Sequence, residues 1–384
     1  MFFEYLIKLG FAAMAASFCM SMLIVVSERW HGKLSNDHDL NGVQKVHTTA
    51  VPRVGGVAVL VGMVAGLWIF VQLWPQALNA VRIYRLEALI VVGAPAFVAG
   101  IVEDITKKVS VKVRLAATIL SALLASFALG ATVNEVDIWG IDLLLLVTPI
   151  AVCVTALLVA GGANAINIID GFNGLSSSTL MLIAAGLSYV AWQNGDGFVT
   201  LLGALCIGAT LGFFLFNYPF GKLFLGDGGA YFLGFWVAEM AVLLLVRRPE
   251  VNAWQLLGIC GYPVIEVMFS IYRRKFIKKV SPGAADALHL HTLIYRRVVF
   301  PMVARNPQRP WQRNAAVVLF VVPVVACSIF ASAAFGHNIL VAAALVVAQF
   351  CIYVLAYRRL VHGRWTIPGL FAFGNAEESA QQHS

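Results

Sequence analysis

Residues of the kinds that bind metal ions and phosphates interrupt an otherwise apolar sequence at five places. The five segments are QKVHTTAVPRVGG (44–56), VEDITKKVSVKVR (102–114), NAINIIDGFNG (164–174), FNYPFGKLFLGDGG (216–229) and DALHLHTLIYRR (286–297). Carboxylate and amide oxygens suit hard cations such as Mg²⁺, and Lys and Arg side chains bind phosphate groups. If the fold brings these segments together, they predict a site for a metal ion and phosphates.

The segment 164–174 gives the clearest geometric expectation. Asn164, Asn167 and Asp170 are three residues apart. If a helix continues through them, side chains at this spacing share one face. Gly171 and Gly174 then allow a tight turn, with Asn173 left between them.

Membrane-spanning helices are the elements that must position these segments. The chain has 384 residues, of which 60% are hydrophobic and 12% are charged, and its mean hydropathy is +0.84, so we expect an integral membrane protein. Apolar segments long enough to cross a bilayer predict an all-α fold with eleven spans: 3–26, 51–73, 85–101, 111–130, 141–160, 175–192, 198–216, 229–246, 253–271, 314–334 and 338–356. We interpret the first as a span, because no basic stretch precedes it and no convincing cleavage site follows.

The five polar segments all follow odd-numbered spans, which places them on one side of the membrane. That side also carries 22 of the 27 Lys and Arg residues. By the positive-inside rule it is cytoplasmic, with the N-terminus outside. The net charge of +8 follows from these loops, and no nucleic-acid signature is present. We expect one membrane domain over residues 1–360 and a short cytoplasmic tail over 361–384. The six cysteines lie inside apolar segments, which argues against zinc or redox chemistry.

The motifs resemble those of the polyprenyl-phosphate N-acetylhexosamine-1-phosphate transferases, which form glycosyltransferase family 4. The similar motifs are KVHTTAVPRVGG, the pair ED, NAINIIDGFNGL, FLGDGGAYFLG and HLH, and the similarity spans about residues 1–360. The resemblance implies helices around a cytoplasmic cleft and Mg²⁺ or Mn²⁺ as cofactor. It also implies transfer of a sugar 1-phosphate from a UDP-sugar to a polyprenyl phosphate, with release of UMP.

The resemblance implies that Asp227 and Asn167 are the metal ligands. Glycines around Asp227 would let the backbone approach a diphosphate at a helix N-terminus, whose dipole favours anions. The implied catalytic acids are Glu103, Asp104 and Asp170. Two adjacent carboxylates repel each other, which raises the pKa of at least one and suits a base acting on the lipid phosphate. Between Glu103 and Asp104 we slightly favour Asp104.

The remaining implied site residues bind the substrates. For the nucleotide they are Asn164, Asn173, Asn217 and Phe224, with the Asn173 amide paired to uracil and Phe224 stacked on the base. For the phosphates they are Lys45, Arg53 and Lys112. For the sugar and diphosphate they are His289, His291 and Arg296. In an extended segment the two histidines would point to one side.

We therefore expect a multi-pass enzyme of the bacterial inner membrane that transfers N-acetylhexosamine 1-phosphate from a UDP-sugar to undecaprenyl phosphate. This would be the first membrane step of O-antigen or other cell-envelope polysaccharide synthesis. The lipid phosphate would attack the donor directly, with an aspartyl-phosphate intermediate as the alternative. Peptidoglycan lipid-I synthase is the alternative enzyme, which the HLHTL segment disfavours, and a nucleotide-sugar or lipid transporter is the alternative class. The expected partners are the two substrates and membrane lipids, and a homodimer is left open.

Overall fold

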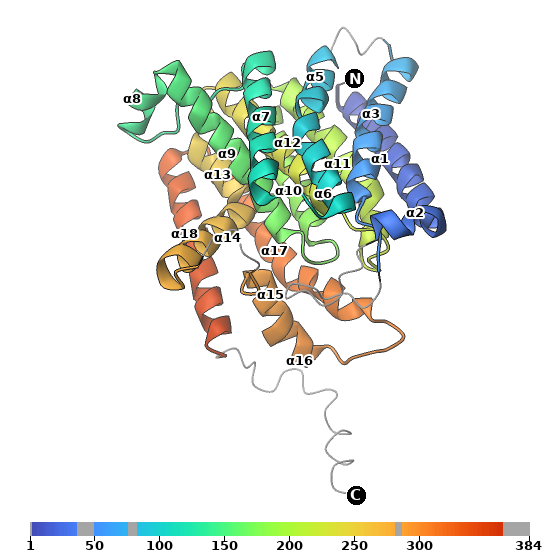
Figure 1. Ribbon diagram of the computed structural model, residues 1–384. Helices are drawn as coiled ribbons and strands as arrows, with labels where there is room; N and C mark the ends of the chain where they lie inside the picture. Colours follow the sequence, from blue (N-terminus) through green and yellow to red (C-terminus); the bar gives the residue numbers. More distant parts are fainter. Residues whose placement is uncertain (1, 37–49, 76–82, 281–285, 364–384) are drawn as a thin grey trace, which may run out of the picture.

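The fold is a bundle of helices. The computed structural model describes residues 2–36, 50–75, 83–280 and 286–363. Within these ranges the chain forms helices and no strand, apart from an isolated bridge between Asn36 and Pro52. The helices stand side by side (Figure 1), which confirms the all-α expectation.

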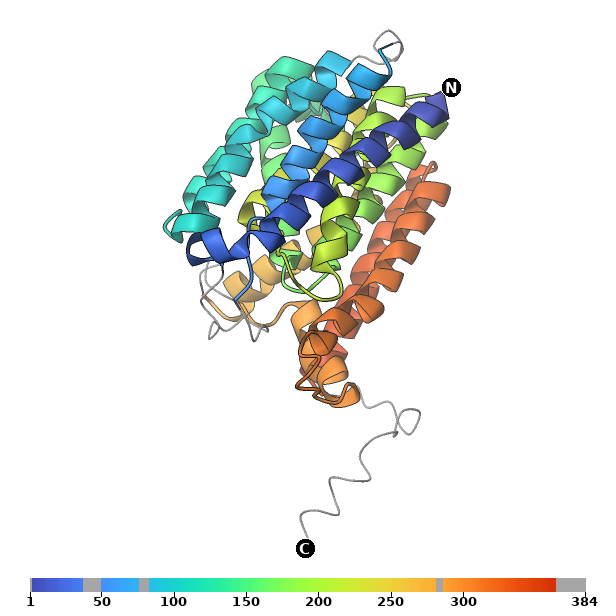
Figure 2. The same cartoon turned by 90° about the vertical axis from the view of Figure 1, so that its right-hand side faces the viewer.

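Nine helices in the described ranges are each long and apolar enough to cross a membrane. They are α1 (Phe2–Val26), α3 (Gly55–Leu73), α7 (Val111–Leu129), α9 (Thr148–Ile169), α10 (Leu175–Gln193), α11 (Gly197–Asn217), α12 (Gly226–Arg247), α17 (Trp311–Phe335) and α18 (Ile339–Val361). Seen from the side, α17 and α18 form one edge of the bundle and α7 lies at the opposite edge (Figure 2).

Two bent pairs of helices complete the spans. Helix α5 (Ile83–Val92) and helix α6 (Ala94–Thr106) meet at 44°, and helix α13 (Ala253–Ile259) meets helix α14 (Gly261–Tyr272) at 85°. With each pair taken as one span, the described residues contain up to eleven, the number that the sequence predicts.

Short helices lie at the two ends of the bundle. They are α2 (Glu28–Ser35), α8 (Ile141–Leu145), η1 (Arg273–Ile277), α15 (Leu290–Ile294), η2 (Tyr295–Val299) and α16 (Phe300–Met302), and η1 and η2 are π-helical. Helix α8 lies at the upper end in Figure 1, while α2, α15 and α16 lie at the lower end.

The fifth predicted span, residues 141–160, is displaced along the chain. Helix α8 takes up the start of that apolar stretch, and the span itself is α9, which begins with Pro149 in its first turn and continues to Ile169. Proline is favoured there because the first helical N–H groups have no partner inside the helix. The shift places Asn164 and Asn167 inside a helix.

Helix α12 is at the centre of the bundle. It packs against α9, α6, α3 and α10, and its side chains Phe232, Phe235 and Trp236 are fully buried. The first turn of this helix carries Asp227. This largely buried helix therefore carries a carboxylate in its first turn.

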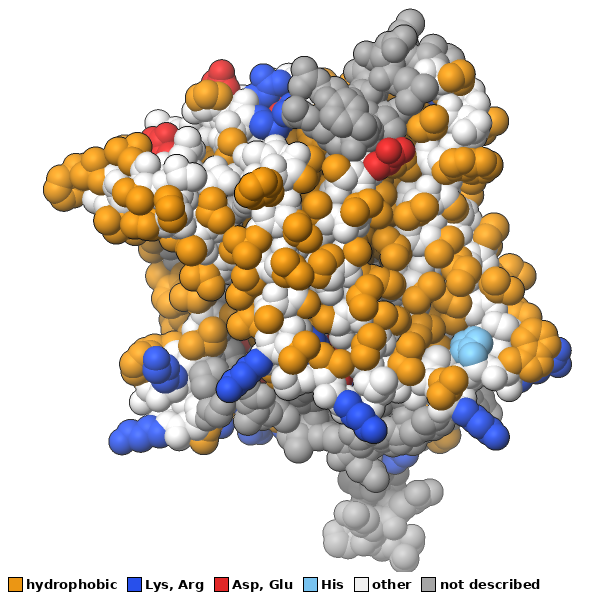
Figure 3. Space-filling view, turned by 45° about the horizontal axis from the view of Figure 1, so that its top comes forward, with side chains coloured by type: hydrophobic (Ala, Val, Ile, Leu, Met, Phe, Trp, Pro, Cys, Tyr) orange, Lys and Arg blue, Asp and Glu red, His pale blue; other side chains and the backbone are white. Residues whose placement is uncertain are grey.

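The polar segments gather at one end of the bundle. The α6–α7, α9–α10 and α11–α12 connections lie at the lower end in Figure 1, and so do the described residues just before α3 and just before α15. The face shown in Figure 3 is mainly hydrophobic, and most visible Lys and Arg side chains lie along its lower rim. The described residues of the five segments thus share one face, as their parity predicts.

Candidate active site

A polar cavity of about 520 Å³ lies where these segments meet. Its lining comes from α6, α7, α9, α12, α14 and η1, together with residues just before α3, in the α9–α10 connection and near the start of α15. The polar side chains along it are Arg53, Glu103, Arg114, Asn164, Asn167, Asp170, Asp227, Tyr231, Ser270, Arg274, Asp286, His289, His291 and Thr292. Acids, amides and cations therefore face a common space, as the sequence analysis anticipates.

Asp227 is the centre of the contacts in this cavity. Its Oδ1 accepts hydrogen bonds from Arg53 Nη2 at 3.2 Å and from Asn167 Nδ2 at 3.0 Å. Its Oδ2 accepts from Arg114 Nη1, which forms a second ion pair. A carboxylate thus lies between two guanidinium groups and an amide.

The donor atoms at Asp227 and Asn167 fit a divalent cation. Mg²⁺ prefers oxygen ligands and usually takes only one or two from protein. Rotating the Asn167 amide by half a turn directs its oxygen at the position its nitrogen occupies, and amide orientation is an assignment. In the described part of the chain no three His, Cys, Asp or Glu residues group to hold a metal. The remaining ligands would then come from phosphate oxygens and water.

Asp104 lies behind the cavity wall and caps the N-terminus of α12. Its Oδ1 and Oδ2 accept hydrogen bonds from the backbone N–H groups of Asp227 and Gly228, both at 2.9 Å, and its side chain is 0% exposed. Arg53 lies 3.6 Å from the same carboxylate. Of the acidic pair only Glu103 lines the cavity, where its Oε2 accepts from Val109 N. In this arrangement Asp104 holds α12 in position, which is a different role from the predicted base.

The glycines around Asp227 serve helix packing. Gly226 adopts a φ of +75°, and a side chain there would collide with the Arg53 carbonyl oxygen and the Asp104 carboxylate. A Cβ on Gly100 of α6 would collide with the backbone of Gly228. The sequence predicts that these glycines let the backbone approach a diphosphate. In the structure, protein backbone lies against Gly226 and Gly228 instead.

Backbone pairing brings Arg53 to Asp227. Phe224 N donates to Pro52 O at 2.9 Å, and Gly55 N donates to Phe224 O at 2.9 Å. This short ladder aligns the residues before α3 with those before α12, so that Arg53 and Asp227 meet although 174 positions separate them.

Asn164, Asn167 and Asp170 all line the cavity, which confirms that they share a face. Asn164 Oδ1 accepts from the Tyr231 hydroxyl at 3.4 Å. Asp170 is the C-cap of α9 and accepts a hydrogen bond from Ser176 Oγ. Burial raises the pKa of the Asp170 carboxyl to about 6, against the opposing effects of the Ser176 hydrogen bond and the Arg53 charge.

The predicted uracil-binding residues do not line the cavity. Asn173 is buried, with its Nδ2 donating to Pro219 O at 3.0 Å and its backbone N–H donating to Asn314 Oδ1 at 2.7 Å. Asn217 bridges Gly174 N and Leu223 O. Both asparagines therefore hold the α9–α10 and α11–α12 connections together. Phe224 is half-buried in the ladder described above, and its contact with a base stays a prediction.

Three predicted cations are not placed in the cavity. Lys45 falls outside the described residues. Lys112 and Arg296 are exposed, and neither is among the residues that line the cavity. Arg114 and Arg274 line it. Ser110 is the N-cap of α7, with its Oγ accepting from Val113 N. The helical turn that follows separates the outward Lys112 from the inward Arg114.

His289 and His291 reach the cavity side by side. Their rings stack with centroids 5.4 Å apart and planes at 11°. His289 is the N-cap of α15 and His291 lies inside that helix, so the segment is not the extended loop expected, although both rings do point to one side. Burial lowers the pKa of His291 to about 4, which leaves this ring neutral at physiological pH.

Two buried carboxylates beside these histidines were missed by the sequence analysis. Glu266 Oε1 lies 2.9 Å from His289 Nδ1, and Asp286 Oδ2 lies 3.8 Å from His289 Nε2. Burial opposes ionisation of Asp286, but the Arg273 hydrogen bond and charge hold its pKa below the usual value. Glu266 could have been flagged as an acid inside an apolar span, because such residues are rare without a functional partner.

Comparison with known proteins matches residues 86–245 to the model of glycosyl transferase family 4. A probable undecaprenyl-phosphate N-acetylglucosaminyl 1-phosphate transferase of Bacillus subtilis is 29% identical over 65% of this chain, and an undecaprenyl-phosphate alpha-N-acetylglucosaminyl 1-phosphate transferase of Thermotoga maritima is 27% identical over 66%. A phospho-N-acetylmuramoyl-pentapeptide-transferase of Anoxybacillus flavithermus is 27% identical over 51%. The alignments cover 66%, 72% and 61% of these three relatives, respectively.

The matched residues 86–245 include the acidic pair, the whole of α9 and the start of α12. They therefore contain Asp227, Asn167 and Asp170, the side chains that the fold brings to one cavity. The chain is a multi-pass membrane protein, and its residues 86–245 match glycosyl transferase family 4.

Proposed function

We propose that this chain transfers N-acetylhexosamine 1-phosphate from a UDP-sugar to undecaprenyl phosphate and releases UMP. The observation that carries the proposal is the contact of Asp227 with Asn167, Arg53 and Arg114 in a polar cavity at one end of a membrane bundle. A diphosphate donor and a lipid monophosphate bring several negative charges together, so a metal ion and guanidinium groups must compensate them. The names of the relatives support this substrate class.

Asp227 and Asn167 would hold Mg²⁺ or Mn²⁺, which neutralises phosphate charge and polarises the phosphoryl group when bound. Arg53 and Arg114 are already paired with Asp227, and they can exchange part of that contact for phosphate oxygens, which guanidinium groups bind in a bidentate way. The two arginines therefore orient the donor diphosphate.

In the reaction that we propose, an oxygen of the lipid phosphate forms a bond to the β-phosphorus of the donor. The bond from that phosphorus to the bridging oxygen breaks, and UMP leaves. Glu103 and Asp170 line the cavity together with Asp227, so one of them takes the last proton of the lipid phosphate. Asp104 is a poorer candidate for this base, because both of its oxygens accept hydrogen bonds from the N-terminus of α12.

The membrane setting supports a lipid acceptor. Helices that can cross a bilayer surround the cavity, at the end where most of the Lys and Arg side chains visible in Figure 3 lie. We place this end on the cytoplasmic side of a bacterial inner membrane, where a water-soluble donor and a membrane-bound acceptor would meet. The reaction would be the first membrane step of O-antigen or another cell-envelope polysaccharide.

The test uses the full-length chain in nanodiscs that contain undecaprenyl phosphate and Mg²⁺. The donors are UDP-GlcNAc, UDP-GalNAc and UDP-MurNAc-pentapeptide, each labelled in the nucleotide, with release of UMP and the mass of the lipid product as readouts. We expect UMP release that requires the lipid, together with a lipid carrying diphosphate and one N-acetylhexosamine. A product carrying MurNAc-pentapeptide would support peptidoglycan lipid-I synthesis instead. Absence of lipid-dependent UMP release with every donor would refute the transferase.

A further inference from the structure

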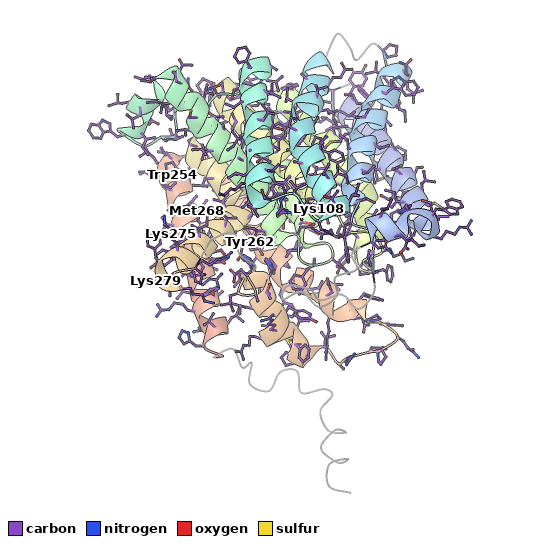
Figure 4. All side chains as sticks on the ribbon, in the orientation of Figure 1. Lys108, Trp254, Tyr262, Met268, Lys275 and Lys279 are labelled. Atoms are coloured by element: carbon purple, nitrogen blue, oxygen red, sulfur yellow. The ribbon has the colours of Figure 1, made fainter. Side chains whose placement is uncertain are left out.

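One face of α14 contacts the segment that carries the two histidines. Tyr262, Glu266 and Ser270 are four residues apart, so their side chains lie along the same side of the helix. Each contacts a residue near the start of α15. Tyr262 lies toward the interior of the molecule, whereas Lys275 and Lys279 lie at its outer edge (Figure 4).

Glu266 contacts both the His289 ring and the α15 N-terminus. Its Oε1 lies 2.9 Å from His289 Nδ1, and Leu290 N donates to Oε1 and Oε2 at 3.2 Å each. The glutamate side chain is only 1% exposed. A buried carboxylate accepts hydrogen bonds, so Nδ1 of His289 carries a proton. Nε2 is on the opposite side of the ring, 3.8 Å from Asp286 Oδ2.

Tyr262 contacts the second ring. Its hydroxyl lies 3.3 Å from His291 Nδ1. The opposite nitrogen, Nε2, lies beside Gly171, 3.7 Å from the position that a Cβ would take there. Gly171 itself lines the cavity. The two rings therefore turn Nδ1 toward α14, and His291 presents Nε2 toward the α9–α10 connection.

Ser270 and Arg273 anchor the segment at its beginning. Ser270 Oγ donates to Asp286 Oδ2 at 3.1 Å, and Arg273 donates to both oxygens of that carboxylate. Asp286 Oδ1 also accepts from Leu288 N at 3.1 Å. The backbone on the N-terminal side of the histidines is therefore fixed, so the rings are held from α14 and from the chain that precedes them.

We propose that Glu266 and Tyr262 are positioning residues, which hold His289 and His291 so that their Nε2 atoms contact the sugar-phosphate part of the donor. The inference rests on the proposed function, because the donor is the ligand in question. Mutation of the partners that orient metal-ligating histidines typically costs about 10- to 100-fold in metal affinity or activity, and we expect the lower end of that range for these donor-binding rings. A residue that only caps α15 would act on stability and not through the ring.

Double-mutant cycles separate these two roles. Glu266→Gln keeps an acceptor but removes the charge, and we expect it to lower kcat/KM for the UDP-sugar by roughly 10-fold. In a His289→Ala background the same change should lower kcat/KM by less than about 2-fold, because the ring that Glu266 positions is absent. If Glu266→Gln lowered kcat/KM as much in that background as in the wild type, the proposal for Glu266 would be overturned.

Tyr262→Phe removes a single oxygen and is the variant least prone to misfold. We expect it to lower kcat/KM for the UDP-sugar in the wild-type and His289→Ala backgrounds, and to leave kcat/KM unchanged in a His291→Ala background. An equal effect in both backgrounds would overturn the assignment of Tyr262 to His291. The matched control is Glu239→Gln, a glutamate of α12 that is 0% exposed and whose oxygens have no hydrogen-bond partner among the described residues. It should leave kcat/KM unchanged.

A second measurement does not depend on turnover. In the full-length chain labelled with ¹⁵N-histidine, the His289 signal is assigned by its loss in His289→Ala. We expect a protonated Nδ1 in the wild type and a changed signal in Glu266→Gln. An unprotonated Nδ1 in the wild type would overturn the inference even if UMP release is normal. Conversely, a wild-type chain that shows the expected ring but releases no UMP would refute only the proposed function.

Discussion

The two ends of α12 each hold a carboxylate against two arginines, but the carboxylates differ in what else they bind. At the N-terminal end Asp227 pairs with Arg53 and Arg114. At the other end Asp196 pairs with Arg247 at 2.6 Å and lies 3.5 Å from Arg248. By charge and residue type alone the two clusters look alike.

The difference lies in how the nearby helix N-terminus is capped. Asp196 caps its own helix, α11, by accepting from Phe198 N and Val199 N, both at 3.1 Å, and its side chain is 0% exposed. Asp227 caps nothing, because Asp104 reaches across from α6 to cap α12. Since another carboxylate satisfies the helix, Asp227 is left to face the cavity.

An ion pair therefore does not identify a site by itself. Asp196 ties the start of α11 to the end of α12, so we expect it to contribute to stability. Asp227 has a similar pair of arginines but borders the cavity, so we expect it to contribute to catalysis. Four sets of substitutions test this contrast, in order of their expected effect on turnover.

The largest effect is expected from Asp227→Ala. Replacing the carboxylate by a methyl group removes the proposed metal ligand and the negative charge that pairs with two guanidinium groups, so the donor diphosphate is no longer correctly bound. We expect no measurable UMP release at any Mg²⁺ concentration and an unfolding temperature close to that of the wild type. Retention of a tenth of the activity would remove Asp227 from the proposed metal site.

Asp104→Asn should affect turnover and stability together. The amide can accept only with its oxygen, so one N–H at the start of α12 loses a charged acceptor, at a cost of about 2 kcal/mol. A displaced Asp227 then lowers turnover by about 10²-fold. Glu103→Gln, which affects only a cavity-lining side chain, should lower turnover without lowering the unfolding temperature. If Asp104→Asn loses turnover while the unfolding temperature and donor binding stay normal, Asp104 acts as a base after all.

Arg114→Gln and Lys112→Gln form a matched pair on the same helical turn. Arg114 contacts Asp227, whereas Lys112 is exposed. Loss of a charge-assisted hydrogen bond to the donor should raise KM for the UDP-sugar about 10-fold in the Arg114 variant. The Lys112 variant should stay within about 2-fold of the wild type, as for an exposed charge. Equal KM changes in the two variants would show that general positive charge, and not the Asp227 contact, determines donor binding.

The smallest effect on turnover is expected from Asp196→Asn. Burial disfavours the ionised form of Asp196, but hydrogen bonds from Arg247 and Val199 N outweigh this and lower its pKa. A depressed pKa stabilises the fold above the unfolded value of about 3.9, and the contribution is lost as pH falls through the folded pKa. The variant should therefore unfold at a lower temperature than the wild type at pH 7, with the difference shrinking below about pH 4. UMP release at low temperature should be unchanged. A large loss of UMP release at that temperature would show that the Asp196 cluster contributes to catalysis as the Asp227 cluster does.

The spans were predictable because bilayer thickness fixes how many apolar residues each needs. The fifth was misplaced because a hydropathy scan responds to composition and not to backbone hydrogen bonding. It counted the apolar helix α8 as part of the span and ended before Asn164 and Asn167, which are polar although they are helical. Helix caps and the proline at the start of α9 carry the missing information.

The site was predictable in its residue types but not in its exact membership. Asp227, Asn167 and Asp170 were anticipated and do meet. Arg114 replaces Lys112 in the cavity, and Glu266, from a span far along the chain, supports the histidines. These differences depend on how α7 and α14 are rotated against their neighbours, which local sequence does not fix.

The sequence alone determined that the chain is a membrane bundle, and that acids, amides and cations gather at one end of it, because both follow from composition and from the parity of the spans. Only the tertiary structure decided which of two adjacent acids faces the cavity. Successive residues of a helix point about 100° apart, so Glu103 and Asp104 cannot face the same way. Packing against α12 buries Asp104 and leaves Glu103 in the cavity.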